Sequence, residues 1–124
     1  MNVVARRYAN AVVLQVSGRL DQDTCEAFRV DLTQFVGTTL RDQGVLILDL
    51  SGTEYVSSAG LRCFLMASRQ MKAAKGRILV AELQPMVAEI FEISHFDLLF
   101  EMFPTVRDAL GAISTEAVAA YGGG

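Results

Sequence analysis

The residues best placed to do chemistry are two adjacent serines, Ser57 and Ser58, which lie between an apolar run and an amphipathic segment. The apolar run is Val45–Leu48, a pattern typical of a strand that is covered on both faces. After the serines, Leu61 and Leu65 recur at helical spacing. The serines therefore mark the passage from a strand and loop into a helix, where a hydroxyl can accept hydrogen bonds from unpaired amides.

The spacing of this serine pair leaves two interpretations open. In the first, one hydroxyl is simply the N-cap of the helix and accepts a hydrogen bond from a backbone amide. In the second, one hydroxyl is a regulatory phosphoacceptor, because the free amides and the dipole at a helix N-terminus also stabilise a phosphate. Spacing alone favours the N-cap.

The segment around the serines resembles the signature of the STAS domain, the fold of bacterial anti-sigma-factor antagonists. The residues that carry the resemblance are Asp49-Leu50-Ser51, Tyr55-Val56 and Ser57-Ser58-Ala59-Gly60-Leu61. In that family the loop reads approximately apolar-Asp-Ser-Ser/Thr-Gly-Leu, and the serine directly after the Asp is phosphorylated by a partner kinase. Alignment on Gly60-Leu61 places Ser58 at the phosphoacceptor position. The resemblance extends from about Val4 to Ile113.

This chain departs from the family pattern at two positions of the loop. Ser57 stands where the family has the Asp that supplies negative charge beside the hydroxyl, and Ala59 replaces a second Ser or Thr, which is the milder change. The resemblance implies that a partner contacts the surface around Ser58. The residues expected in that surface are Ser57, Ala59, Gly60, Leu61 and Arg62.

The resemblance implies a regulatory binding module and not an enzyme. Unphosphorylated, such a protein binds a kinase-type anti-sigma factor and thereby frees a sigma factor. The partner serine kinase phosphorylates Ser58, which ends the complex, and a serine phosphatase restores the hydroxyl. STAS domains also occur in stress-signalling assemblies, in lipid-transport machinery and attached to anion transporters. A binding or scaffold module without phosphorylation is therefore the alternative, which Ser57 favours, and a weak homodimer stays open.

Catalytic and cofactor chemistry finds little support in the sequence. A hydrolase would need Ser58, His95 and Asp97 as a triad, but the nucleophile motif G-x-S-x-G is absent. No phosphate-binding lysine loop, dinucleotide motif or metal-ligand spacing appears, so we expect neither a cofactor nor a metal. Cys25 and Cys63 are far from any CxxC spacing, and we expect reduced, packed thiols.

The overall composition is that of one globular domain. The chain has 124 residues, of which 52% are hydrophobic and 20% are charged. A net charge of −3 argues against nucleic acid as the main partner, because phosphate backbones demand a basic face. No apolar run approaches the length of a membrane span, and the N-terminus lacks a signal-peptide pattern. We expect a cytoplasmic protein.

The order of the elements predicts an α/β fold with a mixed, mostly parallel sheet of about five strands. The resemblance adds that about four helices lie mainly on one side of that sheet. We expect a single domain over residues 1–113, followed by a frayed helix and then disorder over 114–124. Strands are expected at Val3–Ala9, Ala11–Ser17, Val45–Leu50, Ile78–Ala81 and Leu98–Phe103, and helices at about 23–40, 58–74, 85–93 and 105–113.

Local signals set the predicted ends of these elements. Asp23 followed by Glu26 is a capping-box pattern at the start of the first helix. The residues Ser51-Gly52-Thr53 have turn chemistry and are expected to end the central strand. Gly44 and Gly76 are the expected stops of the first two helices.

Overall fold

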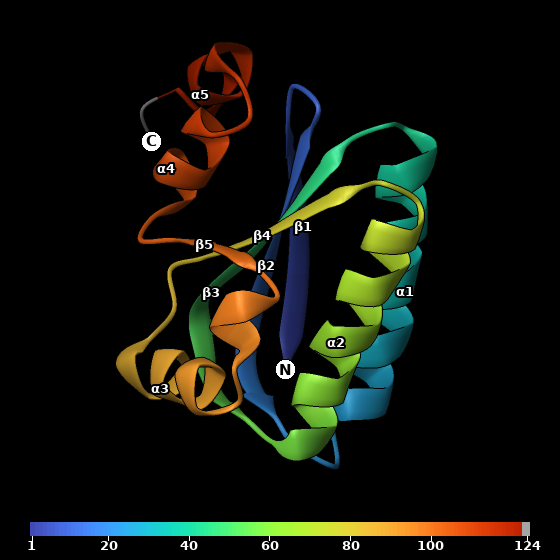
Figure 1. Cartoon of the computed structure of the whole chain (residues 1–124), viewed down its shortest axis with the longest axis vertical. Coiled ribbons are helices and arrows are strands. Elements are labelled where there is room, and N and C mark those ends of the chain that lie inside the picture. The colour runs from blue at the N-terminus through green and yellow to red at the C-terminus, as the bar shows by residue number, and fades with distance from the viewer. Residues whose placement is uncertain (123–124) are drawn as a thin grey trace.

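The structure, a computed structural model, describes residues 1–122 and contains one five-stranded sheet (Figure 1). The strands are β1 (Asn2–Tyr8), β2 (Ala11–Leu20), β3 (Val45–Val56), β4 (Arg77–Ala81) and β5 (Glu101–Phe103). They lie in the sheet in their order along the chain. β1 is antiparallel to β2, and the other neighbouring pairs are parallel. The predicted mixed, mostly parallel sheet is confirmed.

Helices cover the two faces of this sheet unequally. Their bounds are α1 (Cys25–Arg41), α2 (Ser58–Ala73), α3 (Pro85–Ile93), the short 3₁₀ helix η1 (Phe96–Leu98), α4 (Val106–Gly111) and α5 (Thr115–Tyr121). The helices α1, α2 and α3 pack on one face, which we call the first face. The helices α4 and α5 pack on the other, the second face. Figure 1 shows α1 and α2 side by side, well apart from α4 and α5.

The core of the first face is large and rich in phenylalanine. Alternate residues of the central strands, such as Leu48 on β3, point into it and are fully buried. A chain of edge-to-face ring contacts joins the three helices: Phe28 to Phe64 with centroids 5.3 Å apart, and Phe64 to Phe91 at 5.6 Å. This packing fixes α2 and its serine-bearing N-terminus relative to the sheet.

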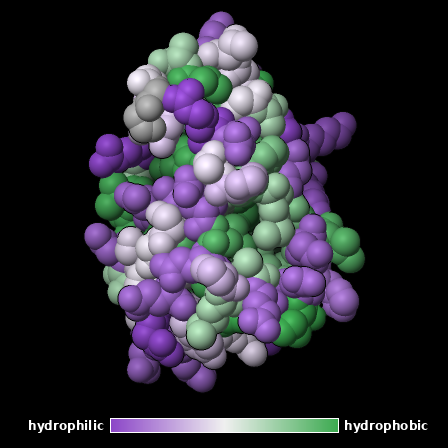
Figure 2. Space-filling model, turned by 90° about the vertical axis from the view of Figure 1, so that its left-hand side faces the viewer, coloured by the Kyte–Doolittle hydropathy of each residue, from purple (hydrophilic) through white to green (hydrophobic). Residues whose placement is uncertain are grey.

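The core of the second face is smaller and contains several alanines. Its buried residues are Ala11, Val13, Ile47, Leu79 and Ala81 from the sheet, with Val106, Ala109, Leu110 and Ala117 from the helices. Small side chains let the short helices α4 and α5 lie close to the strands. The side of the molecule that carries α3, α4 and α5 shows hydrophobic residues among hydrophilic ones (Figure 2).

The central strand is longer than predicted. β3 passes through Ser51–Thr53 and ends at Val56, so the expectation that these residues end the strand was wrong. The reason is pairing, because β2 also extends to Leu20 and the two strands stay parallel along their length. The buried Thr53 hydroxyl donates to the Val16 carbonyl at 2.8 Å, which holds the second half of β3 against β2.

The first helix is capped differently from the prediction. Thr24 is the N-cap residue, and no side-chain capping bond forms there, so the Asp23 capping box was wrong. Asp21 takes the role instead: its Oδ1 accepts from the amides of Asp23 at 3.0 Å and Thr24 at 3.2 Å. The amides before α1 are therefore bonded by an Asx turn at Asp21 in the loop, and not by the predicted capping box at Asp23.

The last predicted strand is only partly formed in the structure. The segment predicted as a strand over Leu98–Phe103 forms η1 and the short β5. Residues 115–121, which lie in the tail expected as a frayed helix and then disorder, form the helix α5, whose Ala117 is fully buried. The positions 123–124 lie outside the described residues, and the boundary of the domain at residue 113 stays a prediction. No helix within residues 1–122 has the length and apolarity needed to cross a membrane.

Candidate partner-binding site

Ser57 is the N-cap of α2, and its hydroxyl oxygen, amide and carbonyl each form a local hydrogen bond. Its Oγ accepts from the Gly60 amide at 3.2 Å. Its own amide donates to the Leu20 carbonyl at 2.8 Å, and its carbonyl accepts from the Leu61 amide at 2.8 Å. These bonds tie the N-terminus of α2 to the end of β2 and hold the serine loop in one conformation.

Ser58 is the first residue of α2 and is exposed. Within residues 1–122 no hydrogen bond involves its hydroxyl. The structure thus assigns the two roles that the spacing left open: Ser57 is the cap, and Ser58 carries the free hydroxyl beside the helix N-terminus. The backbone amides and the helix dipole at the N-terminus of α2 stabilise a negative charge.

The other predicted surface residues differ in exposure. Arg62 is exposed one helical turn after Ser58, whereas Ala59 and Leu61 are half-buried. Gly60 is buried: a Cβ atom there would lie 3.0 Å from both the Leu20 carbonyl oxygen and a Val56 methyl group. The close approach that Gly60 permits is therefore to the chain's own backbone.

A groove lies beside Ser58, between the N-terminal halves of α1 and α2. It encloses about 350 Å³. The residues that line it are Gln22, Cys25, Glu26, Arg29, Ser58, Ala59, Arg62, Cys63 and Met66. The contribution of α1 was not predicted from the sequence, because only the packing of α1 against α2 brings these residues next to the serine.

Charges and thiols give this groove its chemical character. The Arg29 guanidinium donates to both oxygens of Glu26, at 2.6 and 3.1 Å, which lowers the pKa of the Glu26 carboxyl. Both cysteines are free thiols, as expected. Burial raises the pKa of Cys63, whose Sγ donates to the carbonyls of Ala59 at 3.5 Å and Cys25 at 3.6 Å. Cys63 is therefore a packed thiol and a poor nucleophile.

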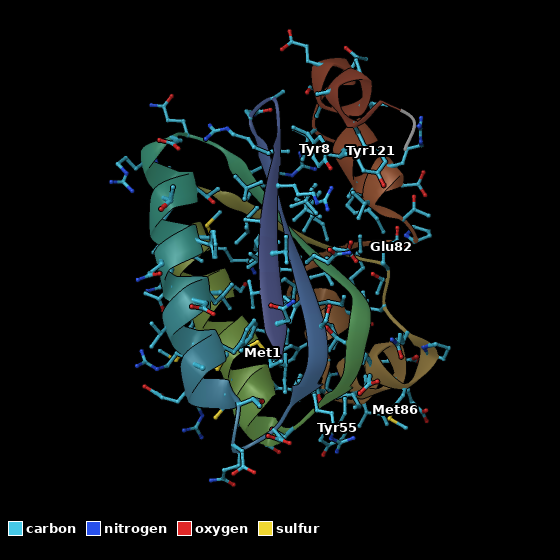
Figure 3. The ribbon with its side chains drawn as sticks, turned by 180° about the vertical axis from the view of Figure 1, so that it is seen from behind. Met1, Tyr8, Tyr55, Glu82, Met86 and Tyr121 are labelled. Atoms are coloured by element: carbon cyan, nitrogen blue, oxygen red, sulfur yellow. The ribbon has the colours of Figure 1, made fainter. Side chains whose placement is uncertain are left out.

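Tyr55, named from the sequence only as part of the family signature and not as a site residue, also lies at this end of the molecule (Figure 3). The Arg19 guanidinium stacks over its ring, 4.6 Å from the centroid. Both residues belong to the ends of neighbouring strands, β2 and β3, directly before the Asp21 turn and the serine loop. Their contact is a cation–π pair at the ends of the strands that lead into these two loops.

The residues considered for catalysis are not arranged as a triad. His95 is exposed between α3 and η1 with φ 61°, and Asp97 is an exposed residue of η1. Within residues 1–122, neither side chain forms a hydrogen bond to Ser58. No group of three or more potential ligands in the described part of the chain could hold a metal ion.

Comparison with known proteins links this geometry to one family. A protein of Bordetella bronchiseptica, BtrV, named as a candidate anti-sigma factor antagonist, is 39% identical over 70 residues. The match spans 56% of this chain and 60% of the relative, so it covers less than two thirds of the relative's length.

Solved structures share the fold over most of the chain. An anti-sigma factor antagonist from Mycobacterium paratuberculosis is 26% identical, with a TM-score of 0.75 over 90% of this chain and 92% of that one. The phosphorylated form of the Bacillus cell fate determinant SpoIIAA is 18% identical, with a TM-score of 0.66 over 91% and 100% of the two chains. The model of the STAS domain matches residues 2–109. This chain therefore belongs to the STAS domain family.

Proposed function

We propose that this protein is an anti-sigma-factor antagonist whose binding to a kinase-type anti-sigma factor is switched off by phosphorylation of Ser58. The observation that carries the proposal is the division of roles between the serines. Ser57 holds the loop through its cap bond to Gly60, so the exposed hydroxyl of Ser58 is free for a partner. Membership of the STAS family and the name of the Bordetella relative support this function.

Phosphorylation of Ser58 would act on the interface and leave the fold intact. A phosphate at the N-terminus of α2 lies near free amides, and Arg62 at i+4 supplies a cation on the same side of the helix. In a close interface the same dianion brings repulsion and the cost of desolvation, so the complex dissociates. The partner-binding surface comprises Ser57, Ser58, Ala59, Leu61 and Arg62, with Gly60 beneath them.

The proposal makes the protein a substrate and not a catalyst. The anti-sigma factor supplies the serine kinase activity, and a separate serine phosphatase restores the hydroxyl. This function places the protein in the cytoplasm, where sigma factors act, and the net charge of −3 does not favour direct binding to nucleic acid.

The absence of the family's Asp at position 57 favours a second candidate function. Ser57 orders the loop through a neutral hydroxyl, at the position where the family has a carboxylate directly before the phosphoacceptor. A STAS module that binds partners as a scaffold, in a stress-signalling or transport-associated assembly, needs the surface but no phosphate.

Phosphopeptide mapping separates these two functions. The protein is incubated with its cognate kinase-type anti-sigma factor and ATP, and the modified residue is identified by mass spectrometry. We expect phosphate on Ser58 in the wild type, none in Ser58→Ala, and continued modification of the matched control Ser57→Ala. Phosphate on Ser57 would contradict the assignment of the two serines, and no phosphate at all would favour the scaffold.

Binding measurements test the switch itself. Ser58→Ala keeps a neutral surface and should retain affinity for the anti-sigma factor, while Ser58→Glu places a charge in the interface and should bind more weakly. Both variants should fold, because Ser58 makes no capping bond and a carboxylate is favourable at a helix N-terminus. Equal affinities of the two variants would count against the switch.

A further inference from the structure

A second hollow lies on the second face of the sheet, where the cover provided by α4 and α5 ends. It encloses about 410 Å³, which is within the range of small-molecule sites. Its walls include Asp49 and Gln15 from the central strands, Arg6 and Tyr8 from β1, and Tyr121 from α5. We call it the second-face hollow, and it involves none of the residues around Ser58.

Asp49 lines this hollow with a carboxylate that is mostly buried. The residue is only 8% exposed. Its Oδ1 accepts from the Ser51 amide at 3.0 Å, and no salt bridge in residues 1–122 includes Asp49. A carboxylate has room for several donors, and a buried charge normally has a charged or multiply hydrogen-bonded partner. Asp49 therefore offers unused capacity to a donor that enters the hollow.

The sheet register arranges further polar groups around this carboxylate. Gln15 on β2 lies directly beside Asp49 on β3. Because paired residues on neighbouring strands point to the same face of a sheet, both side chains lie on the second face. On β1, Arg6 is opposite Val13, whose side chain also lines the hollow. Arg6 is exposed, and no salt bridge among the described residues includes it. The hollow thus has an unpaired carboxylate and, on another strand, an unpaired guanidinium.

Two tyrosines form an aromatic wall at the end of the hollow nearest α5. The rings of Tyr8 and Tyr121 meet edge to face, with centroids 5.1 Å apart. Figure 3 shows them together, one from the end of β1 and the other from α5. Aromatic faces attract organic cations, and their flat apolar area suits the carbon chain of a ligand.

We propose that the second-face hollow binds a small zwitterionic amine, with an ammonium or guanidinium on Asp49 and a carboxylate on Arg6. Gln15 and the two tyrosines would contact the carbon chain and its polar groups between these ends. A simple anion would be repelled by Asp49, and an apolar molecule would remove water from that carboxylate without replacing its hydrogen bonds. Charge-assisted hydrogen bonds at both ends would supply affinity and orientation.

Two probes that differ by one group test both ends of the proposed ligand. L-Arginine carries a guanidinium and a carboxylate, and agmatine is the same molecule without the carboxylate. Binding to the full chain is measured by calorimetry at millimolar ligand. We expect both probes to bind, L-arginine more tightly. The amide resonances that shift should include those near Gln15 and Asp49 in NMR spectra of the wild type.

Variants of the two charged residues should separate their roles. Asp49→Asn keeps an oxygen for the Ser51 amide but removes the charge, and we expect about ten- to a hundredfold weaker binding of both probes. Arg6→Gln should weaken the binding of L-arginine and leave the binding of agmatine unchanged. The control Arg69→Gln on α2 should change the affinity for neither probe.

Four results would overturn the proposal. Two concern the wild type: neither probe binds, or the amide resonances that shift all lie away from Gln15 and Asp49. Two concern the variants: Asp49→Asn binds the probes as tightly as the wild type, or Arg6→Gln weakens the binding of both probes equally. The resonance map of the wild type applies even if Asp49→Asn does not fold. Phosphorylation of Ser58 is measured separately, so each proposal can fail without the other.

Discussion

The two faces of the sheet are built by the same alternation of side chains, yet they are covered to different extents. On β3, Leu48 points into the first face and its neighbour Ile47 into the second, and both are fully buried. The first face lies under helices of up to 17 residues, linked by phenylalanine contacts. The second lies under two helices of 6 and 7 residues, with the hollow at Asp49 beyond them.

This difference suggests that the two faces serve different needs. The large core of the first face supports the N-terminus of α2, where the Ser57 cap holds the loop that carries Ser58, the residue proposed to meet a partner. The second face has a smaller apolar core beside a buried carboxylate. A face that holds the structure together can be fully apolar, while a face that binds a ligand must leave polar groups unsatisfied.

Truncation of the two neighbours on β3 is the strongest test of this comparison. Leu48→Ala and Ile47→Ala should each lower the free energy of unfolding by about 2–5 kcal/mol. We expect the larger loss for Leu48→Ala, because the short helices over Ile47 can move inward and fill part of the cavity, whereas long packed helices cannot. Urea denaturation of both variants measures the difference.

A larger loss for Ile47→Ala would contradict the assignment of the first face as the main core. Leu110→Ala, a truncation on α4, provides the matched control from the helix side. Leu110→Ala should lower the free energy of unfolding by about as much as Ile47→Ala does, since both residues belong to the same second-face core.

A methyl group at Gly60 should disturb the serine loop, whereas the same change at Gly37 should not. The Gly60 Cβ would lie 3.0 Å from the Leu20 carbonyl, but at Gly37 in α1 nothing lies within 4 Å. We expect Gly60→Ala to cost about 1–3 kcal/mol and Gly37→Ala to stabilise by about 0.5–1 kcal/mol. Thermal unfolding measures both, and a neutral Gly60→Ala would show that the loop adapts easily.

Loss of the cap at Ser57 should have a smaller effect. Ser57→Ala removes the acceptor of the Gly60 amide and should cost about 0.5–2 kcal/mol. Ser58→Ala, which removes a hydroxyl without a bond, should change stability much less. Chemical denaturation of the two variants gives the comparison, and equal losses would mean that the cap is shared between the serines.

The ion pair between Arg77 and Glu101 joins β4 to β5 and should have the smallest effect. The guanidinium donates to both carboxylate oxygens, at 2.7 and 2.6 Å, and lowers the pKa of Glu101 from its usual 4.5. The folded state thus binds a proton less readily than the unfolded chain. The stabilisation is present above pH 4.5 and is lost as the pH falls through the lowered pKa.

Glu101→Gln tests this pair. Because the Glu101 side chain is 47% exposed, its loss should cost less than about 1 kcal/mol at neutral pH. The gap in stability between the variant and the wild type should close in acid, below the lowered pKa. A gap that persists there would show that the carboxamide has lost packing and not charge.

Much of the fold follows from patterns that depend on nearby residues. α3 has the predicted bounds, and a helix begins near residue 105 as predicted, where the Thr105 hydroxyl accepts from the Asp108 amide at 3.1 Å. Predictions from local sequence were wrong where pairing with a strand distant in the sequence determines the conformation. Ser51–Thr53 has turn chemistry, but pairing with the extended β2 keeps it in the strand.

The helix stops show a similar limit. The predicted stop residues Gly44 and Gly76 follow residues that themselves have positive φ, Gln43 at 55° and Lys75 at 59°. The glycines are needed for space, since a Cβ at Gly44 would lie 2.7 Å from the Asn10 carbonyl oxygen.

The loop at Ser58 could be located from its motif, but its surroundings could not. The sequence places the serines at a helix start, and it does not say which hydroxyl takes the amide. The groove requires Cys25 and Glu26 of α1 to lie beside Arg62 of α2, a contact made only by tertiary packing. The second-face hollow likewise depends on the register of Gln15 with Asp49.

The order of the strands has a consequence for how the protein forms during synthesis. Each strand lies beside the one translated just before it, so the sheet can grow along one edge as the chain leaves the ribosome. α5 follows all five strands in the chain and brings Tyr121 back to Tyr8, the end of the first strand. The wall of the second-face hollow is therefore completed only after Tyr121 has left the ribosome, and a nascent chain would display the Ser58 loop before it could hold the proposed ligand at Asp49.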